Sequence, residues 1–179
     1  MVPLSTVFFG FVILFAIIGA LRGWAKELLV TFSVVLARFI EYVSLLYVPV
    51  LSASLSAMRD TEPRAWFFLR IVIFGALISA GYATTALSAR IGERARKEKL
   101  QDTLLGVFLG GINGYLITGY LWGFIDELGY SIWGITGPQS DAVSSMIKYL
   151  PRAWLEAEGQ VVLFIAVAVS FAFVLIVFV

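Results

Sequence analysis

The sequence predicts an all-α integral membrane protein with about five transmembrane helices and one amphipathic helix at the membrane interface. Two observations lead to this prediction. The chain has 179 residues, of which 60% are hydrophobic and only 14% are charged, with a mean hydropathy of +0.94. Five apolar segments each reach the length of roughly 18 residues that suffices to cross a bilayer as a helix. A water-soluble domain of this size cannot bury so much apolar surface, so lipid must be the solvent for most of the chain.

The five predicted spans define a core and an addition. They cover residues 4–21, 28–51, 65–89, 103–125 and 161–179. We assign residues 1–155 to the core, which contains the first four spans, and residues 156–179 to an additional C-terminal helix. No charged region precedes the first segment and no convincing small-residue cleavage site follows it, so we expect the first helix to remain in the mature chain.

Polar side chains inside the apolar segments are costly in a membrane and indicate either a structural pair or a site. Arg38 and Glu41 lie near the middle of the second segment, three residues apart on one helical face. They predict a structural ion pair, an interfacial helix, or a polar contact with another helix or subunit. We expect Asn113 to hydrogen-bond between helices. Arg70 lies about one turn into the third segment, and we expect it to extend outward to the headgroups.

Glycines are concentrated in the fourth segment. Those between residues 104 and 123 are Gly106, Gly110, Gly111, Gly114, Gly119 and Gly123. Helices in lipid gain little from burying apolar surface against each other, so they associate through small residues that allow close backbone contact. Gly106, Gly110 and Gly114 are spaced by four and therefore lie along one helical face, which Gly119 and Gly123 continue. This face predicts tight helix packing.

Small residues at the same spacing occur on two other segments. Gly19 and Gly23 end the first segment, and the third segment carries Gly75, Ser79 and Ala83. We expect both sets to pack against the glycines of the fourth segment.

The longest polar connection, residues 126–160, contains an amphipathic pattern over residues 140–155. Apolar residues recur there at helical spacing: Val143, Met146, Ile147, Leu150 and Trp154. Ser140 and Asp141 can cap the start of a helix, and Pro151 should kink or end it. The pattern predicts an amphipathic helix on the outer membrane surface, and it equally suits a docking surface for a partner.

Basic residues in the short connections predict the orientation. With the N-terminus outside, the inner side receives seven of them: Arg22, Lys26, Arg90, Arg94, Arg96, Lys97 and Lys99. The outer side receives four: Arg59, Arg64, Lys148 and Arg152. The positive-inside rule therefore predicts an outer N-terminus and an inner C-terminus. The RARKEK cluster at residues 94–99 contributes most to this difference, as a topology anchor or, alternatively, a site for anionic lipid.

Three stretches carry a family resemblance. GALRGWAKELLVTFSVV at residues 19–35 resembles the Arg-Gly-aromatic-x-(Lys/Arg)-Glu signature of the CvpA family, the colicin V production proteins. DTLLGVFLGGINGYLI at residues 102–117 is similar to the second conserved region of that family, and DAVSSMIKYLP at residues 141–151 resembles its amphipathic C-terminal stretch. The matching positions are Arg22, Gly23, Trp24, Lys26, Glu27, Asp102, Gly106, Gly110 and Gly114.

The resemblance implies a small bacterial inner-membrane protein with a four-helix core and no established enzymatic activity. Members of the family are loosely tied to toxin export, envelope maintenance and biofilm behaviour. Two positions depart from the pattern: Thr103 and Asn113 stand where the family usually has arginine. These departures weaken any proposal that the family's charged positions form an ion path in this chain.

Composition limits the function classes. The chain has no histidine and no cysteine, which removes the commonest general base and metal ligands, and its net charge of +1 implies no nucleic-acid partner. We therefore predict a non-catalytic protein without cofactor or metal, with no identified small-molecule substrate. Its expected partners are membrane lipids and other membrane-protein subunits, for which it would act as an accessory or scaffold subunit. The alternative is a small channel or transporter with a fourth helix broken around Gly110–Gly114.

Overall fold

The computed structural model describes residues 3–83, 99–132, 135, 137–138, 140–157 and 160–178, and the regular secondary structure in these ranges is helical. Within these ranges, four helices are long and apolar enough to cross a membrane. They are α1 (Leu4–Arg22), α2 (Trp24–Leu46), α4 (Pro63–Ala83) and α6 (Lys99–Glu127). The remaining helices are α3 (Pro49–Thr61), α7 (Asp141–Met146), the 3-10 turn η1 (Ile147–Tyr149), α8 (Pro151–Leu155) and α9 (Val161–Phe178).

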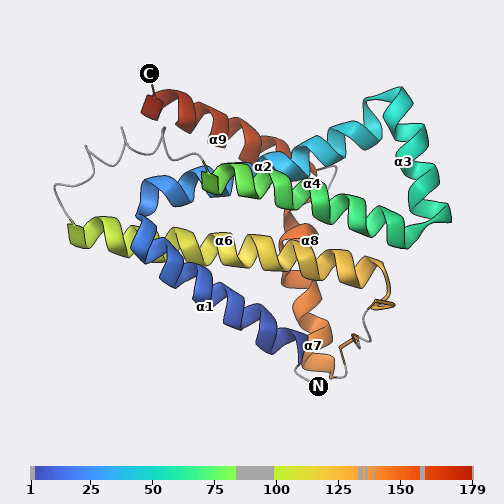
Figure 1. Ribbon diagram of the computed structural model, residues 1–179, viewed down its shortest axis with the longest axis horizontal. Helices are drawn as coiled ribbons and strands as arrows, with labels where there is room; N and C mark the ends of the chain where they lie inside the picture. The colour runs from blue at the N-terminus through green and yellow to red at the C-terminus, as the bar shows by residue number, and fades with distance from the viewer. Residues whose placement is uncertain are drawn as a thin grey trace.

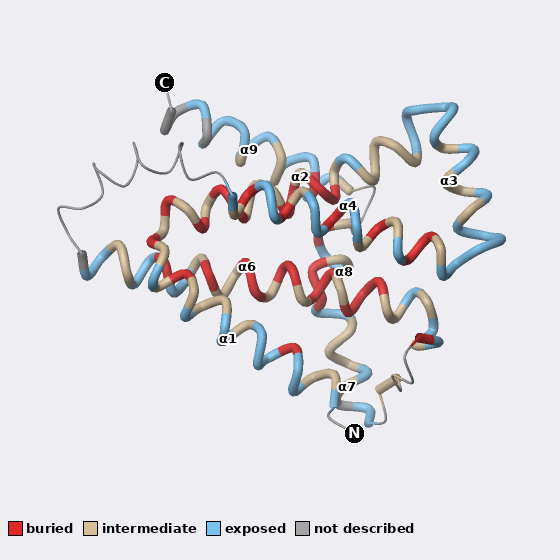
Figure 2. The backbone as a smooth tube through the Cα atoms, viewed as in Figure 1, coloured by how far each residue is buried: buried red, intermediate tan, exposed pale blue. Residues whose placement is uncertain are grey.

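Helix α6 runs through the middle of the molecule, with α1 on one side and α2 on the other, and α4 packs mainly on α2 (Figure 1). Burial follows this arrangement, because buried positions gather on α2, α4 and α6, whereas α3 and α9 are largely exposed (Figure 2). The main core contains Val34 from α2, Phe74 from α4, and Tyr120 and Phe124 from α6. Apolar side chains on the outside of α1 and α9 suit a lipid surrounding.

Gly23 forms the turn between α1 and α2, at a position where a residue with a side chain would not fit. Gly23 has φ 86°, a backbone conformation that L side chains rarely adopt. A Cβ at this position would also lie 2.8 Å from the Asp102 carboxylate oxygens, which come from α6. That carboxylate accepts a hydrogen bond of 3.1 Å from the Trp24 main-chain N–H, so it satisfies a donor at the start of α2.

The second predicted span, over residues 28–51, is wrong at its C-terminal end. Helix α2 ends at Leu46, and Val48 is extended (φ −109°, ψ 96°) because it precedes Pro49. Pro49 then begins α3, at the helix position where its missing N–H costs nothing. None of the predicted spans covers residues 52–64, where most of α3 lies.

Helix α9 covers most of the predicted fifth span. It packs on α2 and beside the end of α8, and Leu163 is its buried residue among those whose side chains are described. The apolar stretch described in full runs from Val161 to Phe173, which is shorter than the roughly 18 residues needed to cross a bilayer. The fifth transmembrane helix therefore stays a prediction.

The predicted amphipathic segment at residues 140–155 forms three short helical pieces instead of one helix. Ser140 caps α7 by accepting a hydrogen bond of 3.3 Å from the Val143 N–H. Leu150 is extended before Pro151, which interrupts the helix and begins α8. Leu150 and Leu155 are buried, while Trp154 is exposed at the surface. Whether this segment lies on the membrane surface stays a prediction.

Candidate functional site

Helices α1 and α6 meet through their glycines, with the two backbones in direct contact. A Cβ added to Gly110 would lie 2.9 Å from the Cα of Gly19, closer than real side chains approach. Gly106 also faces the backbone of Gly19, and a Cβ on Gly114 would lie 2.8 Å from the Phe15 Cβ. The neighbouring Gly111 is different, because an added Cβ would find only the Ala16 Cβ, at an ordinary 3.8 Å. We call the contact of Gly106, Gly110 and Gly114 with α1 the glycine seam.

The other predicted packing glycines lie elsewhere. Gly119 faces Pro151 of α8, with 2.8 Å between an added Cβ and the proline Cγ, and Gly123 faces the Arg152 side chain at 3.7 Å. Gly75 on α4 is exposed, and an added Cβ there would meet nothing within 4 Å. The structure therefore does not bring the small residues around Gly75 to α6. Helix α4 approaches α2 instead, where a Cβ on Gly81 would collide with the Ser33 side chain.

Helix α6 is continuous from Lys99 to Glu127. The predicted break around Gly110–Gly114 is wrong, because the glycines serve the contact with α1 and leave the helical hydrogen bonding intact.

A buried polar cluster joins the middle of α6 to the start of α2. Glu27 and Asn113 are both completely buried. The Asn113 amide donates to the Glu27 main-chain carbonyl at 2.8 Å and to its carboxylate at 2.9 Å. Thr31 Oγ1 donates to the Asn113 side-chain oxygen at 2.7 Å. Asn113 therefore bridges two spanning helices, and its polar atoms find partners that the lipid would not supply.

Six of the residues singled out in the sequence gather around the turn between α1 and α2: Arg22, Gly23, Trp24, Lys26, Glu27 and Asp102. Arg22 Nε lies 3.3 Å from Glu27 Oε1, and its guanidinium stacks 4.2 Å from the centre of the Tyr82 ring. Gly23 and Trp24 contact Asp102, as described above. Lys26 is partly buried in the same turn of α2. The cluster holds the first turn of α2 against both α4 and α6.

At the other end of α2, six charged side chains form a closed ring. The ring comprises, in order, Arg38, Glu41, Arg70, Glu127, Arg152 and Glu156. Arginine and glutamate alternate, so each guanidinium lies between two carboxylates and the six charges sum to zero. We call this arrangement the ion-pair ring. It joins α2, α4 and α6 with α8 and the residue that follows α8.

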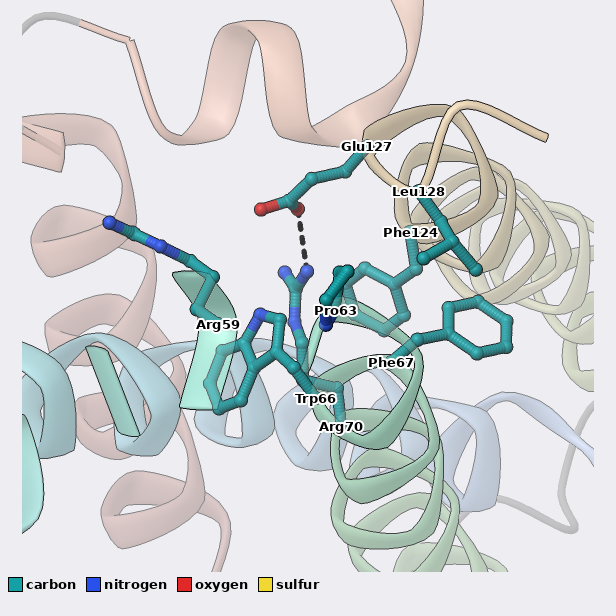
Figure 3. Close-up of a pocket in the computed structure, with 8 residues that line it drawn as sticks. All are labelled: Arg59, Pro63, Trp66, Phe67, Arg70, Phe124, Glu127 and Leu128. Atoms are coloured by element: carbon teal, nitrogen blue, oxygen red, sulfur yellow. Dashed lines mark hydrogen bonds and ion pairs between the residues drawn. The ribbon is translucent and has the colours of Figure 1, made fainter. Parts of the chain in front are cut away.

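The contacts around the ion-pair ring are short on its buried side. Arg38 Nη2 lies 2.7 Å from Glu156 Oε1, and Arg38 also pairs closely with Glu41. Arg70 contacts Glu41 Oε1 at 2.8 Å and Glu127 Oε2 at 2.6 Å, the latter drawn in Figure 3. The side chains of Arg38 and Arg70 are only 5% exposed.

The side that closes the ion-pair ring is more open. Arg152, whose side chain is 40% exposed, binds Glu127 at 2.9 Å and approaches Glu156 at 3.7 Å. The ring therefore passes from the buried bundle to its surface through α8.

Aromatic rings complete the surroundings of the two buried arginines. The Phe124 ring centre lies 4.0 Å from the Arg70 guanidinium and 5.2 Å from that of Arg38, and Tyr120 lies 4.8 Å from Arg38. A guanidinium suits this site because its planar fork can bind two carboxylates while its faces stack on rings.

Sequence reasoning found only part of the ion-pair ring. It singled out Arg38 and Glu41, but the prediction that Arg70 extends outward is wrong, because Arg70 is buried between Glu41 and Glu127. Depth in the membrane would have revealed this pair only with the correct end of the second span. With the observed bounds, Glu41 lies near the end of α2 and Arg70 near the start of α4, so both are at a similar distance from the same membrane face.

Within the described ranges, no group of three or more His, Cys, Asp or Glu side chains is arranged to hold a metal ion. Comparison of the chain with known proteins gives no match to a family model, a curated protein or a solved structure.

Proposed function

We propose that this chain is a non-catalytic multi-pass membrane protein that acts by helix packing, as an accessory or scaffold subunit of a larger membrane assembly. One observation carries the proposal. Glu27, Arg38 and Arg70, the buried charged residues in the described part of the chain, each have an oppositely charged partner within the bundle. Their charges hold helices together, which is a structural use of costly intramembrane groups.

The ion-pair ring also suggests what the chain presents to a partner. Arg152 and Glu156 are the members of the ring that come from outside the spanning helices, and they fix α8 to the bundle. The segment 140–157 is thereby attached to the membrane core at α8, with Tyr149 and Trp154 exposed on it. A fixed surface with exposed aromatic side chains is suited to contact with another subunit.

The resemblance to the CvpA family supports the same function and a bacterial inner-membrane location. With the N-terminus outside, the ion-pair ring lies at the outer end of the bundle, and the connection over residues 84–98 lies inside. That connection, which includes most of the basic cluster 94–99, falls outside the described residues.

A small channel or transporter is the second candidate function. The observation that favours it is Glu27, a completely buried carboxylate in a spanning helix, since such groups often mark a transport pathway. Because α6 is continuous, a broken fourth helix does not support the channel or transporter function.

Isolation from native membranes tests the scaffold proposal. We expect the tagged chain, extracted in a mild detergent, to retain other membrane-protein chains at a fixed stoichiometry. Arg38→Gln should release them because it opens the ion-pair ring, whereas Arg64→Gln should not, because Arg64 is exposed and donates to the Ser131 carbonyl outside the ring. Recovery of the wild-type chain without any fixed partner would contradict the proposal.

A further inference from the structure

Helix α3 (Pro49–Thr61) lies at one end of the bundle and runs across the direction of α4 (Figure 1). None of its residues is buried (Figure 2). Tyr47 and Val48 separate it from α2, and Glu62 alone separates it from α4. Consecutive Cα atoms are about 3.8 Å apart, so each end of α3 stays within roughly 12 Å of a helix that is long and apolar enough to cross a membrane. Where α2 and α4 cross a membrane, α3 must therefore lie at its boundary.

The side chains of α3 divide into an apolar and a polar side. With about 3.6 residues per turn, Leu51, Leu55 and Met58 lie on one side of the helix. Ser56 and Asp60 lie on the opposite side. Leu51 and Asp60 are nine residues apart, which is about two and a half turns, so their side chains point in opposite directions. A helix with this division can lie in the plane of a membrane surface, with its apolar side among the acyl chains and its polar side in water.

The apolar side of α3 is only partly covered by the protein. Leu51 is 45% exposed, and Val50 beside it is 79% exposed. Both continue an exposed apolar surface at the end of α2, where Leu46 and Tyr47 are also exposed. On a spanning helix such a surface faces lipid, so the same surrounding extends onto the first turn of α3. Tyr47 fits this position because tyrosine is enriched at the level of the headgroups.

Charged residues gather at the other end of α3. They are Arg59 and Asp60 within the helix and Glu62 and Arg64 directly after it, all of them exposed. Arg59 and Asp60 pair at 3.3 Å, but a surface pair of this kind contributes little and leaves both groups in need of water or headgroups. Charged side chains are costly inside a bilayer. This end therefore keeps α3 from sinking into the hydrocarbon, while the apolar side keeps it from leaving the membrane surface.

We propose that α3 binds the lipid surface of the membrane through Leu51, Leu55 and Met58, at the face where α2 ends and α4 begins. The occupant of this apolar side is the layer between headgroups and acyl chains, and not a second protein chain. Binding there fixes the depth of the adjacent parts of α2 and α4, which carry Glu41 and Arg70 of the ion-pair ring. The proposal rests on α2 and α4 crossing a membrane and is independent of the scaffold function.

Spin labels on single cysteines test this proposal, because the wild type contains no cysteine. Leu51→Cys and Asp60→Cys, each in the full chain, are labelled with a nitroxide and reconstituted into vesicles of phosphatidylethanolamine and phosphatidylglycerol. Both substitutions replace exposed side chains, so the fold should tolerate them. Power saturation then compares how often each label collides with O₂, which concentrates in lipid, and with a nickel complex, which stays in water. We expect O₂ collisions to dominate at position 51 and nickel collisions to dominate at position 60.

Val72→Cys is the matched control, since Val72 is 66% exposed near the middle of α4 and its label should report lipid. A control label that reports water would mean that α4 does not cross the membrane, which also overturns the proposal. With the control in lipid, any other pattern at α3 overturns it. Nickel collisions that dominate at both positions would place α3 in water. A label at position 51 that neither reagent reaches would mean that a protein chain covers the apolar side, and O₂ collisions that dominate at both positions would mean that the whole helix lies within the hydrocarbon.

Discussion

Arg38 shows how a charge becomes tolerable inside this bundle. Its guanidinium is almost completely enclosed, yet it contacts two carboxylates and lies close to the rings of Tyr120 and Phe124. Removing one partner of such a buried pair costs more than the pair itself contributes, because the remaining charges stay buried without compensation. Arg38 is therefore important for stability because it compensates the negative charges of Glu41 and Glu156.

We expect Arg38→Gln to lower the free energy of unfolding by about 3–5 kcal/mol, the range for breaking a buried ion pair. Arg59→Gln is the control, since Arg59 pairs with Asp60 at the surface and should contribute no more than about 1 kcal/mol. Denaturant titration of both variants in the same detergent measures the difference. Equal losses would show that the ion-pair ring contributes no more than a surface pair.

Tyr130 follows α6, and we expect its ionisation to lower the stability of the fold at alkaline pH. Partial burial and its hydrogen bond to Asp126 raise the pKa of the Tyr130 hydroxyl to about 12, although the hydrogen bond from Trp122 works in the opposite direction. The unfolded chain ionises this hydroxyl near pH 10, while the folded chain retains the proton. The contribution of Tyr130 is therefore fully present below about pH 10 and decreases as the pH rises towards about 12.

Thermal melts of the wild type and Tyr130→Phe between pH 8 and pH 12 test this expectation. The melting temperature of the wild type should fall more steeply above about pH 10 than that of the variant, because phenylalanine has no proton to lose. Parallel curves would mean that Tyr130 ionises equally easily in both states.

At the scale of helices, the glycine seam explains why α6 contains so many residues that disfavour helices. Each glycine costs about 1 kcal/mol relative to alanine, yet Gly106, Gly110 and Gly114 allow the backbone of α1 to approach within direct contact. The gain is dispersion energy along the whole seam, which a larger side chain would remove by separating the helices.

The adjacent positions Gly110 and Gly111 separate packing from helix propensity. Gly110→Leu should disrupt the fold, because an added Cβ would already collide with Gly19. Gly111→Leu should be tolerated better, because its Cβ has ordinary contact distances, and leucine favours a helix at both positions. Thermal stability and recovery of both variants in detergent measure the effect. If Gly110→Leu is as stable as Gly111→Leu, the seam is not a contact face.

The sequence predicted helices better than it predicted their partners. Spacing by four identified the packing face of α6, because periodicity is a local property. The same spacing around Gly75 predicted a contact that the structure does not make, since spacing alone does not say which helix lies opposite. Helix α3 was missed because Pro49 interrupts an apolar run and the helix it begins buries no residue.

The ion-pair ring could be predicted only in part, for a related reason. The pair of Arg38 and Glu41 is local, three residues apart, and was found. Arg38 and Glu156 are 118 residues apart, and no sequence pattern connects them. Their contact depends on where α8 docks, which the interruption at Pro151 and the small surface of Gly119 decide.

At the scale of the whole molecule, two polar clusters fix the bundle at different positions along α2. Glu27 and Asn113 act near its start, and the ion-pair ring acts towards its other end. The glycine seam holds α1 against α6 by direct backbone contact. The central claim of the proposed function is that the buried charges of the two polar clusters serve to hold the helices together.

Ion flux into proteoliposomes tests that claim most directly. Vesicles carrying the purified wild type are compared with protein-free vesicles in a fluorescence assay for protons and in one for potassium. We expect no flux above that of the protein-free vesicles, and Arg38→Gln or Asn113→Ala should lower only the stability or abundance of the protein. Conduction by the wild type that either substitution abolishes would contradict the account and assign the buried charges to a transport pathway.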